Sequence, residues 1–372
     1  MYKTLLLPLL TLALRLVHAQ EEEKISWPEP HPGNYTISNF NFDQGRQLDK
    51  LVLAYQTIGE LKIEDDGTTN AVLLLHGSDA ESGQFLVDSF AGTLFNPGQV
   101  LDAEKYFLIM RDGIGHGLSS NPRNTGLHAS FPSYQYSDMI RADHRLLTEH
   151  FGINHARLIM GVSMGGMHSW MWGEEYPDFM DALMPIASQP VQIGGHNRMW
   201  RRLMMEVIQR DPNWEGGDYK KQPMGSLLGA LSILQTMLQG PLSMAEEYPT
   251  RDAADAFVDG LLDLLAENPN AFDVNSLLYA YNASYTYDPE SRLKSIKAPL
   301  TAVNTDDDLM NPPQLGTIER AVQDQMVEGL GRAVVVPTSN ETFGHGSYID
   351  ANLWKAELMQ LLERSKCPGE GM

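Results

Sequence analysis

Short apolar runs recur along the chain, and most are followed by glycine or aspartate turn residues and then by apolar positions at helical spacing. Buried parallel strands appear as continuous Val, Ile and Leu runs, because helices cover both faces of such a sheet. The alternation therefore predicts a mostly parallel central sheet with helices on both faces. The expected strands are 51–57, 71–75, 106–110, 156–160, 183–187, 300–304 and 333–337.

The pattern changes between residues 189 and 290, where strand-like runs give way to Met, Trp, Arg and amphipathic helical spacing. Such a stretch is typical of a helical lid inserted between core strands. A chain of 372 residues can bury one large core together with an inserted subdomain. We expect helices at 134–151, 165–176, 199–209, 227–238, 314–327 and 349–362. The predicted parts are a leader at 1–19, a first core part at 20–188, the lid at 189–290 and a second core part at 291–372.

The first 19 residues have the layout of a secretory signal peptide. Lys3 precedes an apolar run at 5–14, and the small residues Val17 and Ala19 stand before a polar stretch. The run is too short to span a bilayer comfortably. Arg15 lies close to it, so a signal anchor or a buried N-terminal helix stays open as an alternative. We expect a secreted protein with no membrane span after cleavage.

Other features of the composition bear on this expectation. Three Asn-x-Ser/Thr triplets, at Asn34, Asn282 and Asn340, agree with a glycosylating secretory route. Cys367 is the sole cysteine, so no intrachain disulfide can form. The net charge of -21 repels phosphate backbones, and nucleic acid is not an expected partner. No tight metal-ligand spacing and no phosphate-binding lysine motif occurs, so we expect neither metal nor cofactor.

The strongest chemical motif is the run Gly161-Val162-Ser163-Met164-Gly165-Gly166, between an expected strand and an expected helix. It fits the Gly-x-Ser-x-Gly elbow of α/β-hydrolases. The sharp turn holds the serine in a strained backbone conformation, and the glycines remove side chains that would collide with neighbouring backbone. Ser163 Oγ is then presented at the tip of the sheet, beside a helix N-terminus that favours developing negative charge. The motif predicts a serine nucleophile.

A serine hydroxyl is a poor nucleophile at neutral pH, so it needs a base and an acid that orients the base. In this fold the acid precedes the histidine in the chain. His345 lies in a Gly-flanked loop after the last expected strand, which is the place for the base. Of the aspartates after strand 300–304, Asp308 is favoured because Pro312 stands four residues beyond it, and Asp307 stays open as the alternative.

Acyl chemistry also needs donors aimed at the tetrahedral oxyanion. One is the backbone N–H after the nucleophile, here Met164. The second comes from the loop after the third strand of the fold, where Gly77 or Ser78 would donate.

Four further side chains are candidates for substrate contact. His168 stands one turn past the nucleophile, where it fits a supporting or core role as well. Met and Trp residues of the lid would form an adaptable apolar surface, and plain lid core is the other interpretation. The four candidates are His76, His168, Trp200 and Met204.

At these residues the chain resembles the homoserine O-acetyltransferase-like branch of the α/β-hydrolase superfamily. The likeness extends over most of the chain after the leader, and the run 161–167 together with the lid segment 210–219 is fairly specific to that branch. The resemblance implies the α/β-hydrolase fold, a helical lid over the site and an acyl-enzyme intermediate. It also implies Ser163, Asp308 and His345 as the catalytic triad, and a possible homodimer.

Three functions follow from these observations. The leading hypothesis is hydrolysis of a small-molecule carboxylic ester, lactone or thioester, because water is abundant outside the cytosol and acyl-CoA is not. The alternative is acyl transfer from acyl-CoA to a hydroxyl acceptor such as homoserine or a secondary metabolite, beneath a drier lid. The third is a binding protein that keeps the fold without catalysis.

Overall fold

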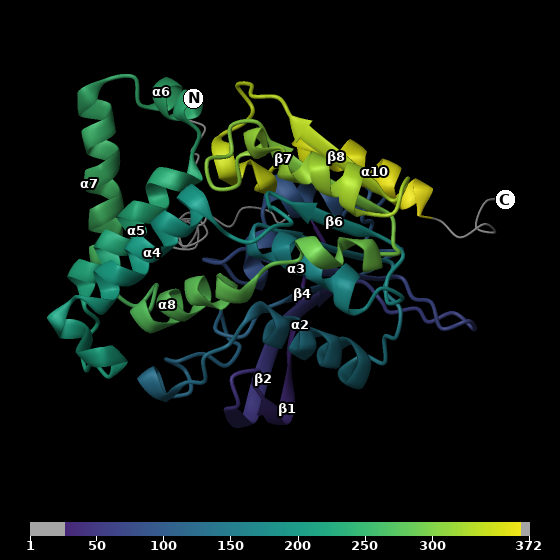
Figure 1. Ribbon diagram of the computed structural model, residues 1–372, viewed down its shortest axis with the longest axis horizontal. Helices are drawn as coiled ribbons and strands as arrows, with labels where there is room; N and C mark the ends of the chain where they lie inside the picture. Colours follow the sequence, from purple (N-terminus) through teal and green to yellow (C-terminus); the bar gives the residue numbers. More distant parts are fainter. Residues whose placement is uncertain (1–26, 366–372) are drawn as a thin grey trace.

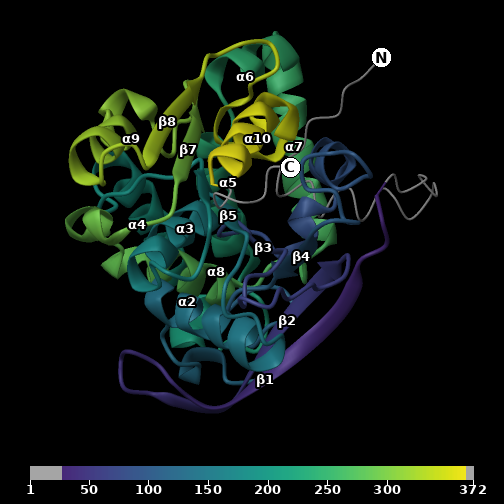
Figure 2. The ribbon, with the colours of Figure 1, turned by 90° about the vertical axis from the view of Figure 1, so that its right-hand side faces the viewer.

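The computed structural model describes residues 27–365, so the expected signal peptide and Cys367 lie outside the described residues. Its centre is an eight-stranded sheet in the order β1-β2-β4-β3-β5-β6-β7-β8 (Figures 1 and 2). β1 pairs antiparallel with β2, and β2 with β4, whereas all pairs from β4 to β8 are parallel. The predicted mostly parallel sheet is confirmed. The strands are β1 His31–Asn41, β2 Gln47–Ile58, β3 Ala71–Leu75, β4 Phe107–Arg111, β5 Leu158–Val162, β6 Leu183–Ile186, β7 Leu300–Thr305 and β8 Gly331–Val336.

Helices cover both faces of this sheet, which explains its continuous apolar strands. Alternate side chains of β3 enter two separate cores, with Val72 and Leu74 on one side and Leu73 on the other. The first core is closed by α10 (Lys355–Arg364), and the second by α2 (Tyr136–Arg145), α3 (Met164–Glu175) and α9 (Thr317–Arg320). The sheet therefore lies in the middle of a three-layer arrangement.

The elements between β6 and β7 are all helical among the described residues, and Figure 1 shows them gathered on one side of the sheet. They have a buried core of their own, which includes Trp200, Leu231 and Leu277. Met310, from the segment after β7, packs into this core and so joins the two parts of the molecule. The helices are α4 Gly195–Gln209, α5 Met224–Leu238, α6 Pro241–Glu247, α7 Arg251–Glu267 and α8 Val274–Asn282.

Several elements differ from the expectation, among them α6, α7 and α8, for which no helix was predicted. Strand β1 was not predicted, because it lies at the sheet edge and few of its side chains are buried. The helix expected at 314–327 begins only at Thr317, after Gly316 in a left-handed conformation, and changes to a π-helical turn at Ala321. The helix expected at 349–362 begins at Lys355, because short 3-10 turns precede it. No helix within residues 27–365 has both the length and the apolar character needed to cross a membrane.

Candidate active site

Ser163 occupies the sharp turn between β5 and α3. Its backbone angles are φ 54° and ψ -113°, in a region that residues other than glycine rarely adopt. The turn packs directly onto the end of β3, since a Cβ added at Gly165 would lie 1.9 Å from the Leu75 carbonyl oxygen. The Gly165 N–H donates to the His76 carbonyl at 3.0 Å. Backbone packing alone thus fixes the position of the serine.

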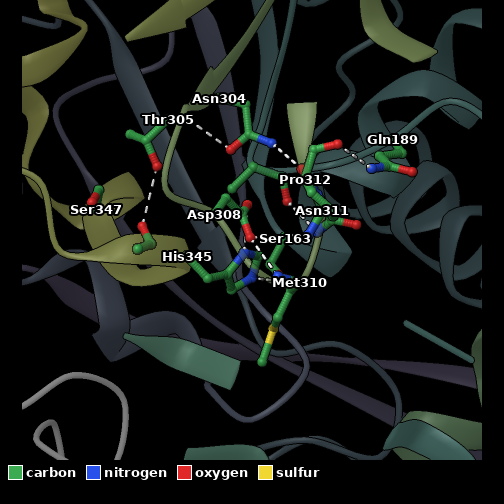
Figure 3. A network of polar contacts seen from close by, with 12 residues as sticks. Ser163, Gln189, Asn304, Thr305, Asp308, Met310, Asn311, Pro312, His345 and Ser347 are labelled. Carbon is green, nitrogen blue, oxygen red and sulfur yellow. Dashed lines mark hydrogen bonds and ion pairs between the residues drawn. The ribbon is translucent and has the colours of Figure 1, made fainter. Parts of the chain in front are cut away.

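The structure brings the three predicted triad residues together (Figure 3). His345 Nε2 lies 2.9 Å from Ser163 Oγ, and His345 Nδ1 lies 2.9 Å from Asp308 Oδ2. Ser163 and His345 are 8% and 2% exposed, so the proton path between them is largely shielded from solvent. This is the geometry by which an imidazole removes a hydroxyl proton while a carboxylate holds its orientation.

The second oxygen of Asp308 is held by the backbone that follows it. Asp308 Oδ1 accepts the N–H groups of Met310 and Asn311 at 2.8 and 2.9 Å. Both oxygens of this buried carboxylate therefore have partners, which keeps it oriented toward His345. Asp308, and not Asp307, is the aspartate in contact with the imidazole.

Asp307 has a different place in the structure. Its Oδ2 accepts the N–H of Gly344, the residue before His345, at 2.9 Å. Thr305 Oγ1 donates to the Gly344 carbonyl at 3.2 Å, so the peptide units before and after Gly344 are both held from the end of β7. The two neighbouring aspartates thus have different contacts. Asp308 contacts the imidazole, and Asp307 fixes the loop that carries His345.

The three predicted oxyanion donors lie around the same turn. Met164 is the first residue of α3, and Gly77 is so close that an added Cβ would be 3.7 Å from Ser163 Cβ. The Gly77 N–H, however, already donates to Gln84 Oε1 at 3.0 Å. The backbone N–H of Ser78 is accordingly the better candidate for the second oxyanion donor, beside the N–H of Met164. Gln84, which also donates to the Tyr348 hydroxyl at 2.8 Å, supports this loop and was not recognised from the sequence.

His76 does not offer its ring to a substrate. It is fully buried. Nδ1 contacts the Gly77 carbonyl at 2.7 Å and Nε2 accepts the Gly113 N–H at 2.9 Å. Burial, together with the positive charge of Arg111, holds the pKa of His76 well below its usual range. The neutral ring therefore joins the loop after β3 that carries Gly77 and Ser78, called the oxyanion loop below, to the loop after β4.

His168 is also buried rather than exposed to a cavity. Its Nδ1 contacts Nη2 of Arg111 at 3.0 Å, and burial followed by that positive charge lowers the pKa of His168 well below its usual range. Arg111 pairs in turn with Asp143 at 2.9 Å. Burial raises the pKa of Asp143 to about 6, and Arg111 acts against that rise. His168 thus belongs to a buried polar cluster behind the nucleophile, the supporting role that its position also allowed.

Trp200 and Met204 lie in the packed interior of the lid. They are 3% and 1% exposed and share a core with residues of α5 and α8. The Trp200 ring meets Tyr281 edge to face at 5.4 Å. This placement fits the plain lid-core interpretation and does not put either side chain on a cavity surface.

A cavity of 550 Å³ extends from the oxyanion loop toward α8. Its lining includes Ser78, Asp79, His116, Arg123 and Leu277, so it is bordered by the loop after β3, the Gly-rich loop after β4 and the lid. Burial raises the pKa of Asp79 to about 6. Asp79 directly follows the oxyanion loop, yet no motif had singled it out. Residues 27–365 contain no cluster of His, Cys, Asp and Glu side chains able to hold a metal ion.

The model of the alpha/beta hydrolase fold family matches residues 70–318, two thirds of the chain. The chain belongs to this family. Among its relatives is a probable acyltransferase of Methanothermobacter thermautotrophicus, 29% identical over 295 residues, which are 79% of this chain and 88% of that protein. A homoserine O-acetyltransferase of Geotalea daltonii is 28% identical over 346 residues, 84% of this chain and 91% of that enzyme.

Solved structures of similar proteins agree with this assignment. Homoserine O-acetyltransferase from Bacillus anthracis superposes with a TM-score of 0.77 at 21% identity, over 91% of this chain and 98% of that one. An acetylester hydrolase from Corynebacterium glutamicum gives 0.73 at 22% identity, over 90% and 96%. At these identities the likeness shows the fold. The predicted α/β-hydrolase fold and the resemblance to the homoserine O-acetyltransferase-like branch are confirmed.

Proposed function

We propose that this α/β-hydrolase-fold protein is a secreted serine hydrolase that cleaves a small-molecule carboxylic ester through an acyl-enzyme on Ser163. The observation that carries the proposal is the continuous contact from Ser163 Oγ through His345 to Asp308, with both contacts at 2.9 Å. Each atom lies within hydrogen-bond distance of the next, as proton transfer requires.

In the first half of the reaction His345 Nε2 takes the Ser163 proton as Oγ attacks the ester carbonyl carbon. Asp308 stabilises the resulting imidazolium. The carbonyl oxygen becomes an oxyanion, which the N–H groups of Met164 and Ser78 receive. The tetrahedral intermediate then collapses, the carbon–oxygen bond to the alcohol breaks, and the alcohol leaves with the proton from His345.

In the second half a water molecule replaces the alcohol. His345 takes a proton from the water as its oxygen attacks the acyl carbon, and the acid leaves when Ser163 Oγ regains a proton. The cavity beside the oxyanion loop is lined by apolar side chains and also by polar ones, among them Asn121, Asn124 and Arg123. Polar side chains of this kind can hydrogen-bond water next to the oxyanion loop, which supports hydrolysis as the leading proposal.

The chain is an enzyme of the ester hydrolase or O-acyltransferase class, as predicted. Acyl transfer to a hydroxyl acceptor is the second candidate, and the relatives named probable acyltransferase and homoserine O-acetyltransferase favour it. In that reaction an acceptor alcohol takes the place of water in the second half, and the same three residues act.

Activity on p-nitrophenyl acetate and a panel of methyl esters and lactones tests the proposal. We expect turnover by the wild type, and a loss of at least about 10³-fold in kcat for Ser163→Ala. Absence of turnover, with Ser163→Ala indistinguishable from the wild type, would falsify it. The product ratio with acetyl-CoA and homoserine or other alcohols separates the two candidates, since a transferase forms O-acyl product faster than free acid.

Secretion and dimer formation are separate parts of the proposal. Secretion is supported by the charge and apolar pattern of residues 1–19. Expression in a secreting host, followed by N-terminal sequencing, should give a mature chain that begins at Gln20. Retention of residues 1–19 on the exported protein would contradict cleavage. The homodimer follows from the family resemblance, and light scattering of the purified protein decides it.

A further inference from the structure

The loop that carries Asp308 is held by the lid as well as by the sheet. Asn197, in the first turn of α4, donates from Nδ2 to the Met310 carbonyl at 2.8 Å and to Asn311 Oδ1 at 3.1 Å. Met310 and Asn311 are also the residues whose N–H groups hold Asp308 Oδ1. One lid side chain therefore contacts both residues that orient the carboxylate.

Arg201, one turn further along α4, determines how the Asn197 amide is turned. Its Nε donates to Asn197 Oδ1 at 2.7 Å. A guanidinium has only donors. The Asn197 amide must therefore present its oxygen to Arg201 and its NH₂ group to the loop that carries Asp308. Arg201 is itself fixed, being 2% exposed and placed against the Trp200 and Tyr281 rings at 4.9 and 5.2 Å.

The sheet side of the same loop has its own contacts. Asn304 Nδ2 donates to the Asn311 carbonyl at 2.6 Å, and Asn311 Nδ2 donates to the Ala187 carbonyl at 2.9 Å. Figure 3 shows Asn304, Asn311 and Met310 around Asp308. These contacts fix Asn311 from the sheet side but leave the Met310 carbonyl to the lid, because the hydrogen bond to that oxygen comes from Asn197.

We propose that Asn197, oriented by Arg201, is a positioning residue for Asp308. It keeps the 310–311 backbone in place, so that the carboxylate stays in line with His345 Nδ1. The inference rests on the proposed serine chemistry at Ser163. A displacement of about 1 Å in a catalytic group can cost on the order of 10²-fold in rate, so the contact bears on kcat without touching the substrate.

The test compares Asn197→Asp with Asn197→Ala. Asn197→Asp keeps the size of the side chain and the acceptor for Arg201, but it replaces the donor by an oxygen that faces two other oxygens. Asn197→Ala removes both the donor and the acceptor of this side chain. His196→Ala is the matched control, because His196 is the exposed neighbour in the same helical turn. The measurements are kcat and KM for the best ester, the rate of Ser163 phosphonylation by a fluorophosphonate, and Tm.

We expect kcat and the phosphonylation rate to fall about 10- to 100-fold in both Asn197 variants, with KM within about twofold and His196→Ala like the wild type. A role in packing alone predicts that Asn197→Asp behaves as the wild type, which would overturn the proposal. A rise in KM at constant kcat would overturn it too, since it indicates substrate contact. If Asn197→Ala does not fold, Asn197→Asp decides.

Failure of the proposed function gives a different result. A wild type that turns over no ester and transfers no acyl group, but whose Ser163 is phosphonylated rapidly, contradicts the proposed activity. Slower phosphonylation of Asn197→Asp in that case still supports the positioning role. Equal phosphonylation rates in the wild type and in Asn197→Asp overturn the positioning role whatever the activity.

Discussion

The sheet and the lid hold the candidate site in different ways. At the sheet, backbone is packed against backbone, and an added Cβ at Gly161 or Gly165 would meet main-chain atoms at 2.3 and 1.9 Å. At the lid, side-chain hydrogen bonds reach into loops, and α7 buries only a narrow stripe that includes Leu261 and Leu265. The nucleophile is thus fixed by sterics that cannot adjust, whereas the acid depends on contacts that single substitutions can remove.

The largest effect is expected at the acid loop, where two adjacent aspartates have separate contacts. Asp308→Asn places an amide beside His345 and no longer selects the imidazole tautomer that accepts the Ser163 proton. We expect kcat to fall by about 10⁴-fold with little change in Tm. Asp307→Asn keeps an acceptor for the Gly344 N–H and should lose at most about tenfold. Steady-state kinetics of the two variants check this, and equal losses would contradict the division of roles.

Gly165→Ala tests the steric side of the comparison. The new methyl group would collide with the Leu75 carbonyl at the end of the central strand β3, and neither β3 nor α3 can move without disturbing the core. We expect a loss of about 3 kcal/mol in the free energy of unfolding. Denaturant unfolding measures it. A variant as stable as the wild type would show that the turn can relax.

A buried acid in α3 gives the core a dependence on pH. Burial raises the pKa of Glu174 to about 8, although Arg292 acts against that rise. Between about pH 5 and 8 the folded chain therefore holds a proton that the unfolded chain has released, so stability falls as pH rises through this window. Each pH unit corresponds to about 1.4 kcal/mol at most.

Glu174→Gln removes this dependence. We expect the variant to gain about 2 to 4 kcal/mol relative to the wild type at pH 8 and almost nothing at pH 5. Thermal unfolding across the range measures the difference. A gain that is the same at both pH values would mean that Glu174 is ionised in the folded protein throughout.

The smallest effect is expected in the lid. Gly260 lies within α7, and nothing stands within 4 Å of the position of an added Cβ. Gly260→Ala should stabilise the helix by about 0.5 to 1 kcal/mol, because alanine loses less backbone entropy there than glycine. Chemical denaturation provides the measurement. Destabilisation would indicate that this face of α7 is covered by another molecule.

Much of the fold could be predicted because its core strands are short apolar runs between turn residues. The run 71–75 is observed as β3 with the same bounds, and 183–187 differs from β6 by one residue. β1 could not be predicted in this way, since Ile37 and Phe40 are its only fully buried side chains. In the lid, α7 was not predicted, because most of its residues are exposed and only a narrow stripe of the helix is buried.

Some residues of the candidate site could be predicted from the sequence, and others could not. Ser163 and His345 could be found because each lies in a glycine-flanked turn with a recognisable place in the chain order. The surroundings of His168 could not, since its partner Arg111 is 57 residues away and only the fold brings the two together. The same is true of Asn197, whose contacts with Met310 and Asn311 span more than 110 positions.

One contact at the far end of α5 links the lid to the base. The Gly240 N–H donates to the Phe343 carbonyl at 3.1 Å, and an added Cβ at Gly344 would lie 2.3 Å from the Gly240 nitrogen. Any movement that lifts this end of α5 must break that bond, whereas Asp307 and Thr305 still hold Gly344. The position of this end of the lid and the position of the histidine loop are therefore coupled, since the backbone of one is bonded to the backbone of the other.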